Sequence, residues 1–575
     1  MDAINAVKVK FTCFQQVNQE LKKQSQNIAY EFSSDEPVSV LEQECSTLPL
    51  VLSNTDDTPQ KNVAVVVDGG KNMSLDFCGS VLECEGKLQP LTIRGSEHIT
   101  VKNLTIDWKI PLTAEGTICH MNHKELTLKI DASQFPYQIE NRRLFFLGNG
   151  EPAILKEGSH TVFHPLTKTV CMKEGDELRL TACQQNPDGT VTFYGDFPVV
   201  YPEGAVIVLR HSERVHAGIF VENCKQVKFE NVTIHATGGL GILCQFNQDL
   251  TFQHVSFAPR TARGRQVVCG HDDGLHLTNN SGRITVEDCY FYGLMDDPIN
   301  VHGLCARIQE VVDEYTVKGR FVHPQARNFR LFARIGDRFS VIRNSSMHSM
   351  GTTVAEQYEL LDKETFLLRF SQPIPPETRA GDALENLTNT ASFVCRNNFF
   401  GSCRARGILV STPRPVLIEH NLFQSAGSAI LIAGDANYWY ESGACHDVTI
   451  RDNTFSEECL STPYESCEGI ISLCPVVPTP DKNHLFHRNV LIENNTFFPH
   501  QVCVLYAFCT EHLKLQNNRI FYCQGIHSGS ARSPLFRFHC CRQVTLEQNH
   551  IVGAFEQPVY SLEDTDPAEV MEYHS

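Results

Sequence analysis

The stretch Val416-Leu-Ile-Glu-His-Asn-Leu-Phe423 decides the fold of this 575-residue chain. Its apolar residues alternate at Val416 and Ile418, which predicts a strand with one buried face. Asn421 and Phe423 follow after a two-residue skip, and this skip indicates a sharp bend between two strands. The pattern apolar–x–apolar–x–x–(Asn or apolar)–x–apolar has nine further copies, which start at Ile99, Val227, Leu250, Ile284, Phe393, Val448, Val490, Leu513 and Val544.

The spacing of these copies indicates a solenoid. Three of the steps are 23 residues, from 227 to 250, from 393 to 416 and from 490 to 513, and others are 31 to 42 residues, which is one coil plus a longer loop. A fixed period in this range is typical of stacked repeats, in which each coil buries its inner face only against its neighbours. Successive strands then lie about 4.8 Å apart, and the Asn side chains stack into a ladder. We therefore expect an all-β, right-handed parallel β-helix.

Two stretches break the pattern, residues 108–215 and 303–390. Both contain alternating strands and turn signals without the coil motif, so we expect two inserted antiparallel, barrel-like β domains. An amphipathic segment near Val17–Leu21 is expected to cover the open edge of the first coil. The expected division is an N-terminal cap at 1–45, β-helix at 46–107, inserted domain at 108–215, β-helix with the functional coils at 216–302, inserted domain at 303–390, β-helix at 391–555 and an acidic tail at 556–575.

Composition narrows the class of partner and the compartment. The formal net charge is −18 and no Lys/Arg-rich block occurs, which argues against nucleic acid and weighs mildly for a neutral substrate. No run of 18 apolar residues occurs, so we expect no membrane span. The N-terminus lacks the features of a signal peptide. That predicts a cytoplasmic protein, or a secreted or periplasmic one if the sequence begins at a mature end.

The 23 cysteines are scattered, and none form the CxxC pairs of a zinc site. We expect most to be small, reduced, buried residues that fill repeat positions. Disulfides in a secreted protein are the alternative.

Two acidic segments stand out, His271-Asp-Asp-Gly-Leu-His276 and Met295-Asp-Asp-Pro-Ile-Asn-Val-His-Gly303. Asp273 and Asp296 are 23 residues apart, which is one coil, so stacking places their backbones about 4.8 Å apart. Like charges so close raise the pKa of at least one carboxyl group, as a general acid beside a general base requires. An inverting glycosidase holds its two carboxyl groups roughly 6.5–9.5 Å apart.

Asp296 and Asp297 are neighbours, so on a straight strand they point to opposite faces. Both reach one cleft only if the backbone bends there. The alternative is that each Asp-Asp pair is an ordinary turn or a solvated loop.

Three longer motifs carry a family resemblance, Leu294-Met-Asp-Asp-Pro-Ile-Asn-Val-His-Gly303, Arg404-Ala-Arg-Gly-Ile-Leu-Val-Ser-Thr-Pro413 and Gly434-Asp-Ala-Asn-Tyr-Trp-Tyr-Glu-Ser-Gly-Ala-Cys-His-Asp-Val448. They closely resemble signatures of the α-1,3-galactosidases of glycoside hydrolase family 110, and a weaker likeness extends from about Pro49 to about residue 550.

The resemblance implies a β-helix with inserted β-barrel domains that removes terminal α-1,3-linked galactose from blood-group-B-type or linear glycans. It implies inversion, and no metal or other cofactor. Asp296 then carries over as the general acid, and Asp273 and Asp297 as the groups that position and activate water.

Further residues are candidates for substrate binding. Trp439 can stack on the apolar face of galactose, or it anchors a loop. Glu441 can accept bonds from sugar hydroxyls, or it is surface charge. Arg404 and Arg406 follow their repeat start by nearly the same distance as Asp296 follows its own, so one of them is expected near the carboxylates, where it lowers a pKa. A structural salt bridge is the alternative for both.

His276, Asn300 and His302 flank the aspartates and are further candidates for binding sugar hydroxyls, with a structural role as the alternative. Two other functions stay open. One is a calcium-dependent β-helix polysaccharide lyase, and the other is a non-catalytic glycan-binding adhesin. Whether the protein forms a homodimer is left open by the sequence.

Overall fold

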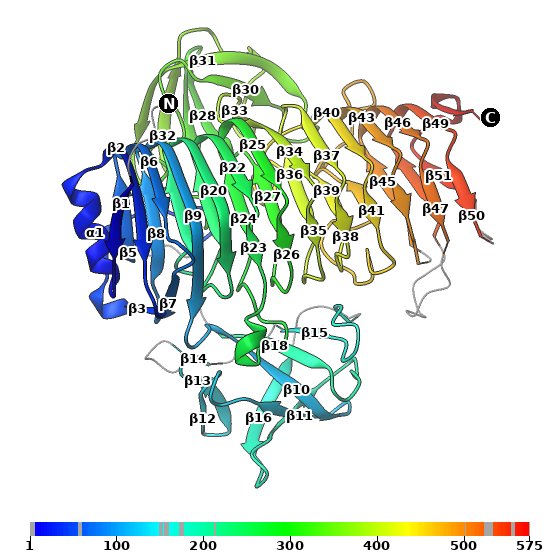
Figure 1. Cartoon of the computed structure of the whole chain (residues 1–575). Coiled ribbons are helices and arrows are strands. Elements are labelled where there is room, and N and C mark those ends of the chain that lie inside the picture. Colours follow the sequence, from blue (N-terminus) through cyan, green and yellow to red (C-terminus); the bar gives the residue numbers. More distant parts are fainter. Residues whose placement is uncertain are drawn as a thin grey trace.

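The computed structural model describes residues 6–55, 60–148, 153–154, 160–171, 178–211, 214–500, 502–522, 533–553 and 558–573. They form a long parallel β-helix with two antiparallel domains projecting from it (Figure 1). The predicted fold class, a parallel β-helix with inserted antiparallel β domains, is confirmed. Two sheets run the length of the solenoid, a larger sheet A and a smaller sheet B.

Sheet A consists of β1 (Val7–Lys10), β2 (Gln26–Ser33), β3 (Val38–Leu41), β6 (Lys71–Asp76), β7 (Val81–Glu85), β9 (Glu97–Trp108), β20 (Lys225–Ile234), β22 (Gln248–Gln253), β23 (Ser256–Phe257), β25 (Ser281–Glu287), β26 (Tyr290–Phe291), β34 (Ala391–Arg396), β35 (Phe399–Phe400), β37 (Val416–Glu419), β38 (Leu422–Phe423), β40 (His446–Arg451), β41 (Thr454–Phe455), β43 (His487–Glu493), β44 (Thr496–Phe497), β46 (Thr510–Gln516), β47 (Arg519–Phe521), β49 (Arg542–Glu547), β50 (His550–Val552) and β52 (Val570–Tyr573). Sheet B consists of β4 (Ser46–Pro49), β5 (Gln60–Asp68), β8 (Gln89–Arg94), β19 (Ile219–Glu222), β21 (Ile242–Gln245), β24 (Leu275–Thr278), β27 (Ile299–His302), β36 (Ile408–Ser411), β39 (Ile430–Ile432), β42 (Ile471–Leu473), β45 (Leu505–Phe508), β48 (Phe536–His539) and β51 (Tyr560–Glu563).

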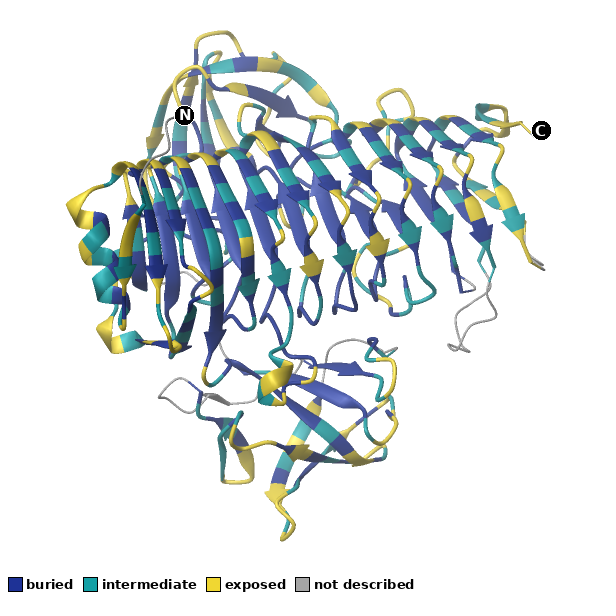
Figure 2. Cartoon of the chain, viewed as in Figure 1, coloured by how far each residue is buried: buried dark blue, intermediate teal, exposed yellow. Residues whose placement is uncertain are grey.

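The repeat motif sets the register of sheet A. Phe393 pairs with Val416, and Val416 pairs with Val448, so equivalent apolar positions stack coil upon coil. These inward residues form one continuous buried core (Figure 2). At the bend, Asn398 donates from Nδ2 to Oδ1 of Asn421 at 3.0 Å, and the same bond continues through the later coils to Asn549. The predicted asparagine ladder is therefore present.

Both ends of the solenoid differ from a plain cap and tail. Helix α1 (Phe14–Lys23) buries Phe14, Val17 and Leu21 against the first coil. Residues before 46 also supply β1, β2 and β3 to sheet A, so the solenoid begins earlier than expected. Within the expected acidic tail, β51 pairs with β48 and β52 pairs with β49, and these strands complete the last coil.

The first inserted domain lies between β9 and β19 of the β-helix, and the second lies between β27 and β34. The first holds β10 (Thr113–Met121), β11 (Glu125–Ile130), β15 (His160–Phe163), β16 (Arg179–Gln185), β17 (Val191–Asp196) and β18 (Val206–Arg210), with a small sheet of β12 (Tyr137–Glu140), β13 (Arg143–Phe146) and β14 (Ala153–Ile154). The second is a closed barrel of β28 (Cys305–Asp313), β29 (Thr316–Arg320), β30 (Arg338–Ile342), β31 (Ser349–Leu360), β32 (Thr365–Phe370) and β33 (Ala383–Asn386), inserted directly after β27.

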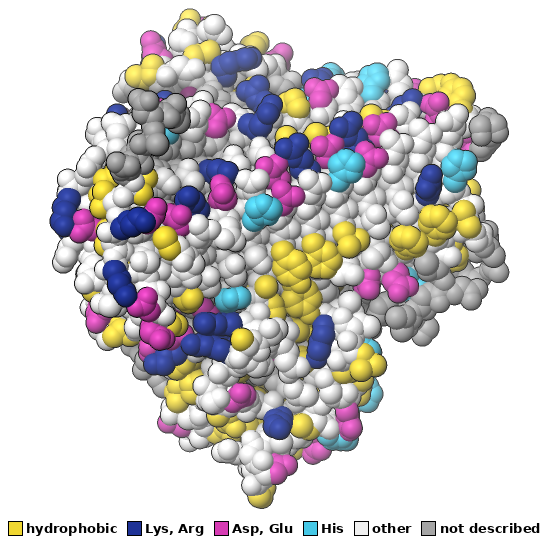
Figure 3. Space-filling model, in the orientation of Figure 1, with side chains coloured by type: hydrophobic (Ala, Val, Ile, Leu, Met, Phe, Trp, Pro, Cys, Tyr) yellow, Lys and Arg dark blue, Asp and Glu magenta, His cyan; other side chains and the backbone are white. Residues whose placement is uncertain are grey.

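The outer face of sheet A carries interspersed acidic and basic side chains (Figure 3). Several form ion pairs between neighbouring coils, such as Arg396 with Glu287 at 2.7 Å and Arg451 with Glu419 at 2.7 Å. Every cysteine in the described part of the chain is a free thiol, and most are buried. Across the same residues, no helix combines the length and apolar character needed to cross a membrane.

Candidate active site

A cavity of about 290 Å³ lies on the outer face of sheet B and contains all three predicted carboxyl groups, Asp273, Asp296 and Asp297. Its floor includes Asn300, Leu409 and Leu431, the outward residues of β27, β36 and β39, whose neighbours along each strand point into the core. The carboxyl groups come from the loops that precede β24 and β27. Side chains far apart in the sequence thus share one cavity because one coil lies upon the next.

The stacking register differs by one residue from the sequence expectation. Leu275 pairs with Ile299, an offset of 24 rather than 23. Asp297 therefore lies over Asp273, and the backbone N–H of Gly274 donates to the carbonyl of Asp297 at 2.9 Å. The placement of Asp296 directly over Asp273 was wrong, because β25 contains one extra residue near Gly282, where its pairing with β22 shifts from an offset of 33 residues to 34.

Asp296 and Asp297 both reach the cavity because the backbone bends at Met295 and Asp296 and again at Pro298. Asp273 and Arg406 are each followed by a glycine, Gly274 and Gly407, at a point where the next coil approaches closely. A Cβ added to Gly274 would lie 2.7 Å from the carbonyl oxygen of Pro298, and one added to Gly407 would lie 2.5 Å from that of Ala429. These glycines let the coils pack tightly beside the carboxyl groups.

Asp297 is held by Arg406. The Nε and Nη2 atoms of Arg406 donate to the two carboxylate oxygens at 2.9 and 2.7 Å, and its backbone N–H adds a third bond at 3.0 Å. Burial raises the pKa of Asp297, and the Arg406 guanidinium opposes that rise. A two-point charge-assisted pair of this kind fixes the position of a carboxylate and favours its ionised form.

Asp296 has looser contacts. The Tyr464 hydroxyl donates to its Oδ1 at 3.3 Å, and guanidinium nitrogens of Arg214 and Arg404 lie 3.6 and 3.9 Å from its Oδ2. Burial, together with the charge of Asp297, raises the pKa of Asp296 to about 6. A carboxyl group with this pKa carries a proton in mildly acidic solution and can release it.

Asp273 heads a chain of buried hydrogen bonds. Its Oδ2 lies 2.7 Å from Nδ1 of His276, whose Nε2 lies 3.1 Å from Nε2 of His302. The Nδ1 atom of His302 lies 2.6 Å from the carbonyl oxygen of Gly303. Burial, followed by the charge of Asp296, raises the pKa of Asp273 well above its ordinary value. Burial also lowers the pKa of His276 to about 4 and lowers that of His302.

The other predicted residues divide into two groups. Trp439, Glu441, Asn300 and Arg406 line the cavity. His276, His302 and Arg404 lie behind it and are buried, so they are not placed to touch a sugar directly. Arg404 instead contacts the Tyr464 hydroxyl at 3.0 Å and the carbonyl of Met295 at 3.2 Å.

Two lining residues are poised for hydroxyl groups. Within the described residues, Oδ1 of Asn300 is buried without a hydrogen-bond partner. Glu441 accepts a bond from Nδ2 of Asn54 at 3.3 Å and lies 3.6 Å from Nε2 of His302. Burial works to raise the pKa of Glu441, but His302, His276 and Arg406 outweigh it and the pKa is lowered. Glu441 is therefore an ionised acceptor.

Sequence reasoning missed Arg214, Tyr464, Asn54 and Gln325, which also line the cavity. Arg214 binds the buried Asp272 at 2.7 Å, so the first aspartate of the His271-Asp272-Asp273 segment anchors an arginine of the site. These residues belong to long loops and to the second barrel, where no repeat pattern fixes their place. The aromatic Tyr464 within its long coil was the one available signal.

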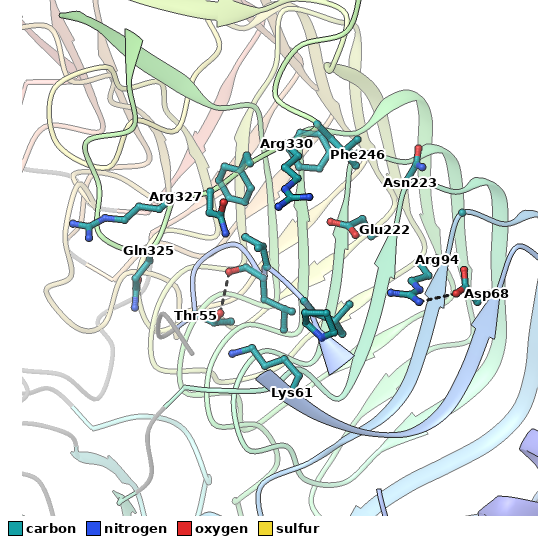
Figure 4. A pocket seen from close by; sticks show the side chains of 18 of the residues that line it. Thr55, Lys61, Asp68, Arg94, Glu222, Asn223, Phe246, Gln325, Arg327 and Arg330 are labelled. Atoms are coloured by element: carbon teal, nitrogen blue, oxygen red, sulfur yellow. Dashed lines mark hydrogen bonds and ion pairs between the residues drawn. The ribbon is translucent and has the colours of Figure 1, made fainter. Parts of the chain in front are cut away.

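A second cavity of about 590 Å³ is shown with its lining side chains in Figure 4. Gln325 lines both, and the segment 49–55 separates them, with Asn54 facing one cavity and Thr55 the other. Its acidic residues are already engaged. Asp68 pairs with Arg94 at 2.7 Å, and Glu222 accepts a bond from Gln245 at 2.8 Å. The smaller cavity is therefore the candidate centre for proton-transfer chemistry.

Comparison with known proteins identifies the family. The chain is 38% identical over 525 residues to alpha-1,3-galactosidase B of Bacteroides thetaiotaomicron, covering 90% of this chain and 85% of that protein. The chain belongs to glycoside hydrolase family 110. It is also 33% identical over 509 residues to alpha-1,3-galactosidase B of Akkermansia muciniphila, covering 87% of this chain and 63% of that one.

The two inserted domains of this family 110 member match family models. Residues 114–207 match GLAA-B beta-barrel domain I, and residues 316–384 match GLAA-B beta-barrel domain II. Among solved structures, the A-module of mannuronan C-5 epimerase AlgE4 from Azotobacter vinelandii aligns over 98% of this chain and 94% of that chain. The identity is 10% and the TM-score 0.35, a likeness too distant to indicate function.

Proposed function

We propose that this family 110 glycoside hydrolase is an exo-acting α-1,3-galactosidase that inverts the anomeric centre. The observation that carries the proposal is the meeting of three buried carboxyl groups in one cavity of about 290 Å³. That volume lies at the small end of ligand pockets and suits one monosaccharide ring. An inverting hydrolase needs one carboxyl group to protonate the leaving oxygen and another to activate water across the ring.

Asp296 is the proposed general acid. Of the three carboxyl groups it alone has neither an arginine fork nor a histidine nitrogen within 3 Å, so its proton can be delivered outward. Its raised pKa, about 6, keeps it partly protonated in mildly acidic solution. Protonation of the glycosidic oxygen by Asp296 would release the aglycone as a neutral alcohol.

Asp297 and Asp273 are the proposed water-activating pair. The fork from Arg406 keeps Asp297 ionised, so it can accept a hydrogen bond from water and stabilise positive charge on the sugar ring. Asp273 takes up the proton of the attacking water. His276 and His302, which lie behind it in one hydrogen-bond chain, determine which oxygen of Asp273 is free to do so.

The hydrogen-bond chain supports one arrangement of the protons, with both histidines neutral. A carbonyl oxygen only accepts, so Nδ1 of His302 donates to Gly303, and the Nε2 of a neutral His302 is an acceptor. Nε2 of His276 therefore donates to His302, and Nδ1 of a neutral His276 accepts from Asp273. Asp273 is thus protonated on Oδ2, in agreement with its raised pKa, and its Oδ1 is available to water.

We infer a proton relay from this arrangement. As water attacks the anomeric carbon, its proton moves to Oδ1 of Asp273, the Oδ2 proton moves to Nδ1 of His276, and the Nε2 proton of His276 moves to His302. The bond from the anomeric carbon to the aglycone breaks as the bond to water forms. The resulting cation on His302 lies 3.6 Å from the Glu441 carboxylate, which stabilises it.

The remaining lining residues suit recognition of galactose. The Trp439 indole is partly exposed beside the cavity and can cover the apolar face of the ring. Oδ1 of Asn300 and the Glu441 carboxylate can each accept a hydrogen bond from a hydroxyl group of the sugar. The segment 49–55 and the loop from Asp435 to Glu441 contribute walls to the cavity, which favours a terminal residue over the interior of a chain.

The test is hydrolysis of galactose-α-1,3-galactose compared with its α-1,4 and α-1,6 isomers. We expect galactose release from the α-1,3 disaccharide, a strong loss in D296N, and no loss in D188N, in which an exposed turn aspartate outside the cavity is changed. Equal hydrolysis of all three isomers would overturn the linkage assignment. An unsaturated, ultraviolet-absorbing product would show elimination rather than hydrolysis.

A further inference from the structure

A cluster of two histidines and one aspartate lies outside the catalytic cavity. His348 is in the turn between β30 and β31 of the second barrel, and Asp481 and His484 are in the long loop between β42 and β43. Each offers one ligand atom, and these three atoms all lie within 4.8 Å of one another. It is the one such group of three or more ligand-type side chains among the described residues.

The side chains of the cluster are held in place by their neighbours. The Ser346 hydroxyl lies 2.8 Å from Nδ1 of His348, which leaves Nε2 of that ring for another partner. Nδ1 of His484 lies 2.8 Å from Oδ2 of Asp481, and the two imidazole rings stack with centroids 4.9 Å apart. A polar neighbour on the second ring nitrogen, as Ser346 is for His348, is what commonly orients a metal-binding histidine.

The cluster offers two imidazole nitrogens and one carboxylate, a set of ligand atoms that suits a divalent transition-metal ion. Metals bind the carboxylate and neutral-imidazole forms of these side chains. The nearby cations are already paired, because Arg343 binds Asp382 at 2.9 Å and Lys482 lies 3.7 Å from Asp564.

We propose that His348, Asp481 and His484 form a binding site for a divalent transition-metal ion, with Zn²⁺ as the preferred ion and water as the fourth ligand. Zinc takes nitrogen and oxygen ligands at about 2.0–2.2 Å in tetrahedral geometry, which separates its ligand atoms by roughly 3.3 Å. Shifts of about 1 Å or less in the side chains meet that spacing. Calcium and magnesium prefer sets made only of oxygen, so they are excluded by the two imidazoles.

The position of the site gives it a consequence. The loop that carries Asp481 and His484 begins at Cys474 and Val476, which line the catalytic cavity. The backbone N–H of Thr479 donates to the carbonyl of Ser345 at 2.7 Å, so this loop already touches the barrel turn that carries His348. A bound metal would lock the two segments together and stabilise that wall of the cavity. It takes no part in bond cleavage.

The direct test is calorimetric titration of tag-free, metal-stripped full-length protein with ZnCl₂. We expect one ion per chain, with affinity at least tenfold weaker in H348Q and in H484Q and unchanged in H550Q, which alters an exposed histidine of β50 outside the cluster. D481N keeps the size of the side chain while removing its charge, and it too should weaken binding.

Thermal unfolding supplies a second readout that does not depend on activity. At a hundredfold excess of Zn²⁺ over its Kd, the Tm of the wild type should rise by roughly 3 °C, and that of H348Q should not rise. No measurable binding by the wild type would overturn the proposal. Binding that is equally tight in H348Q, H484Q and D481N would also overturn it.

Discussion

Replacing Arg406 with methionine should shift the acidic limb of the pH–activity profile. Arg406 makes three bonds of 2.7–3.0 Å to Asp297, two from the guanidinium and one from the backbone, and R406M removes the two that carry charge. Removing one partner of a buried ion pair costs about 3–5 kcal/mol. At 1.36 kcal/mol per pKa unit, the pKa of Asp297 should rise by up to roughly 2–4 units.

A protonated Asp297 can neither hold water nor stabilise the cationic ring. The acidic limb of kcat/KM should therefore move to higher pH, with a loss of about 10²-fold or more at the wild-type optimum. The matched control is R396M, because Arg396 donates from the same two guanidinium nitrogens to one oxygen of Glu287 on the exposed face of sheet A and should matter little. A folded R406M enzyme with an unshifted profile would refute the assignment of Asp297.

Further tests address the remaining groups. D296N should lose roughly 10²–10⁴-fold on the disaccharide and much less on an aryl galactoside whose phenol leaves without protonation; equal losses on both would contradict an acid role. Since Asp296 must be protonated, kcat/KM should fall as pH rises through about 6, and a profile that is flat there would argue against it. H276F should lower kcat with little change in KM and enlarge the solvent isotope effect, whereas a change in KM alone would point to sugar binding instead. Burial alone would raise the pKa of Asp272, but Arg214 leads the groups that hold it well below its ordinary value. D272N should therefore lose about 3–5 kcal/mol in the free energy of unfolding at neutral pH, and this difference should shrink as pH falls below about 4; urea unfolding that showed the same loss at every pH would refute the ion pair.

The coil architecture could be predicted because each repeat must bury the same positions. The positions of Val416 and Ile418 face the core, as do the equivalent positions of the other coils. Asn421 forms hydrogen bonds with the side-chain amides of Asn398 and Asn453 in the two neighbouring coils. Those requirements leave a periodic trace in the sequence. They also bring distant aspartates to one face, which made the candidate carboxyl groups recognisable.

The fine geometry of the site leaves no such trace. The one-residue offset that stacks Asp297 rather than Asp296 over Asp273 depends on a single extra residue in β25, where the pairing with β22 shifts register. The hydrogen bond of His276 to Asp273 turns that ring away from the cavity, although its neighbour in register, Asn300, faces it. Arg214 and Tyr464 enter from loops whose course is set by tertiary packing.

The anomeric form of the first galactose released tests the central claim most directly. Proton NMR should follow the wild-type enzyme on galactose-α-1,3-galactose at times short enough to precede mutarotation. Attack by water from the face opposite the aglycone predicts that β-galactose accumulates first. Initial accumulation of α-galactose would contradict the proposed roles of Asp273, Asp296 and Asp297.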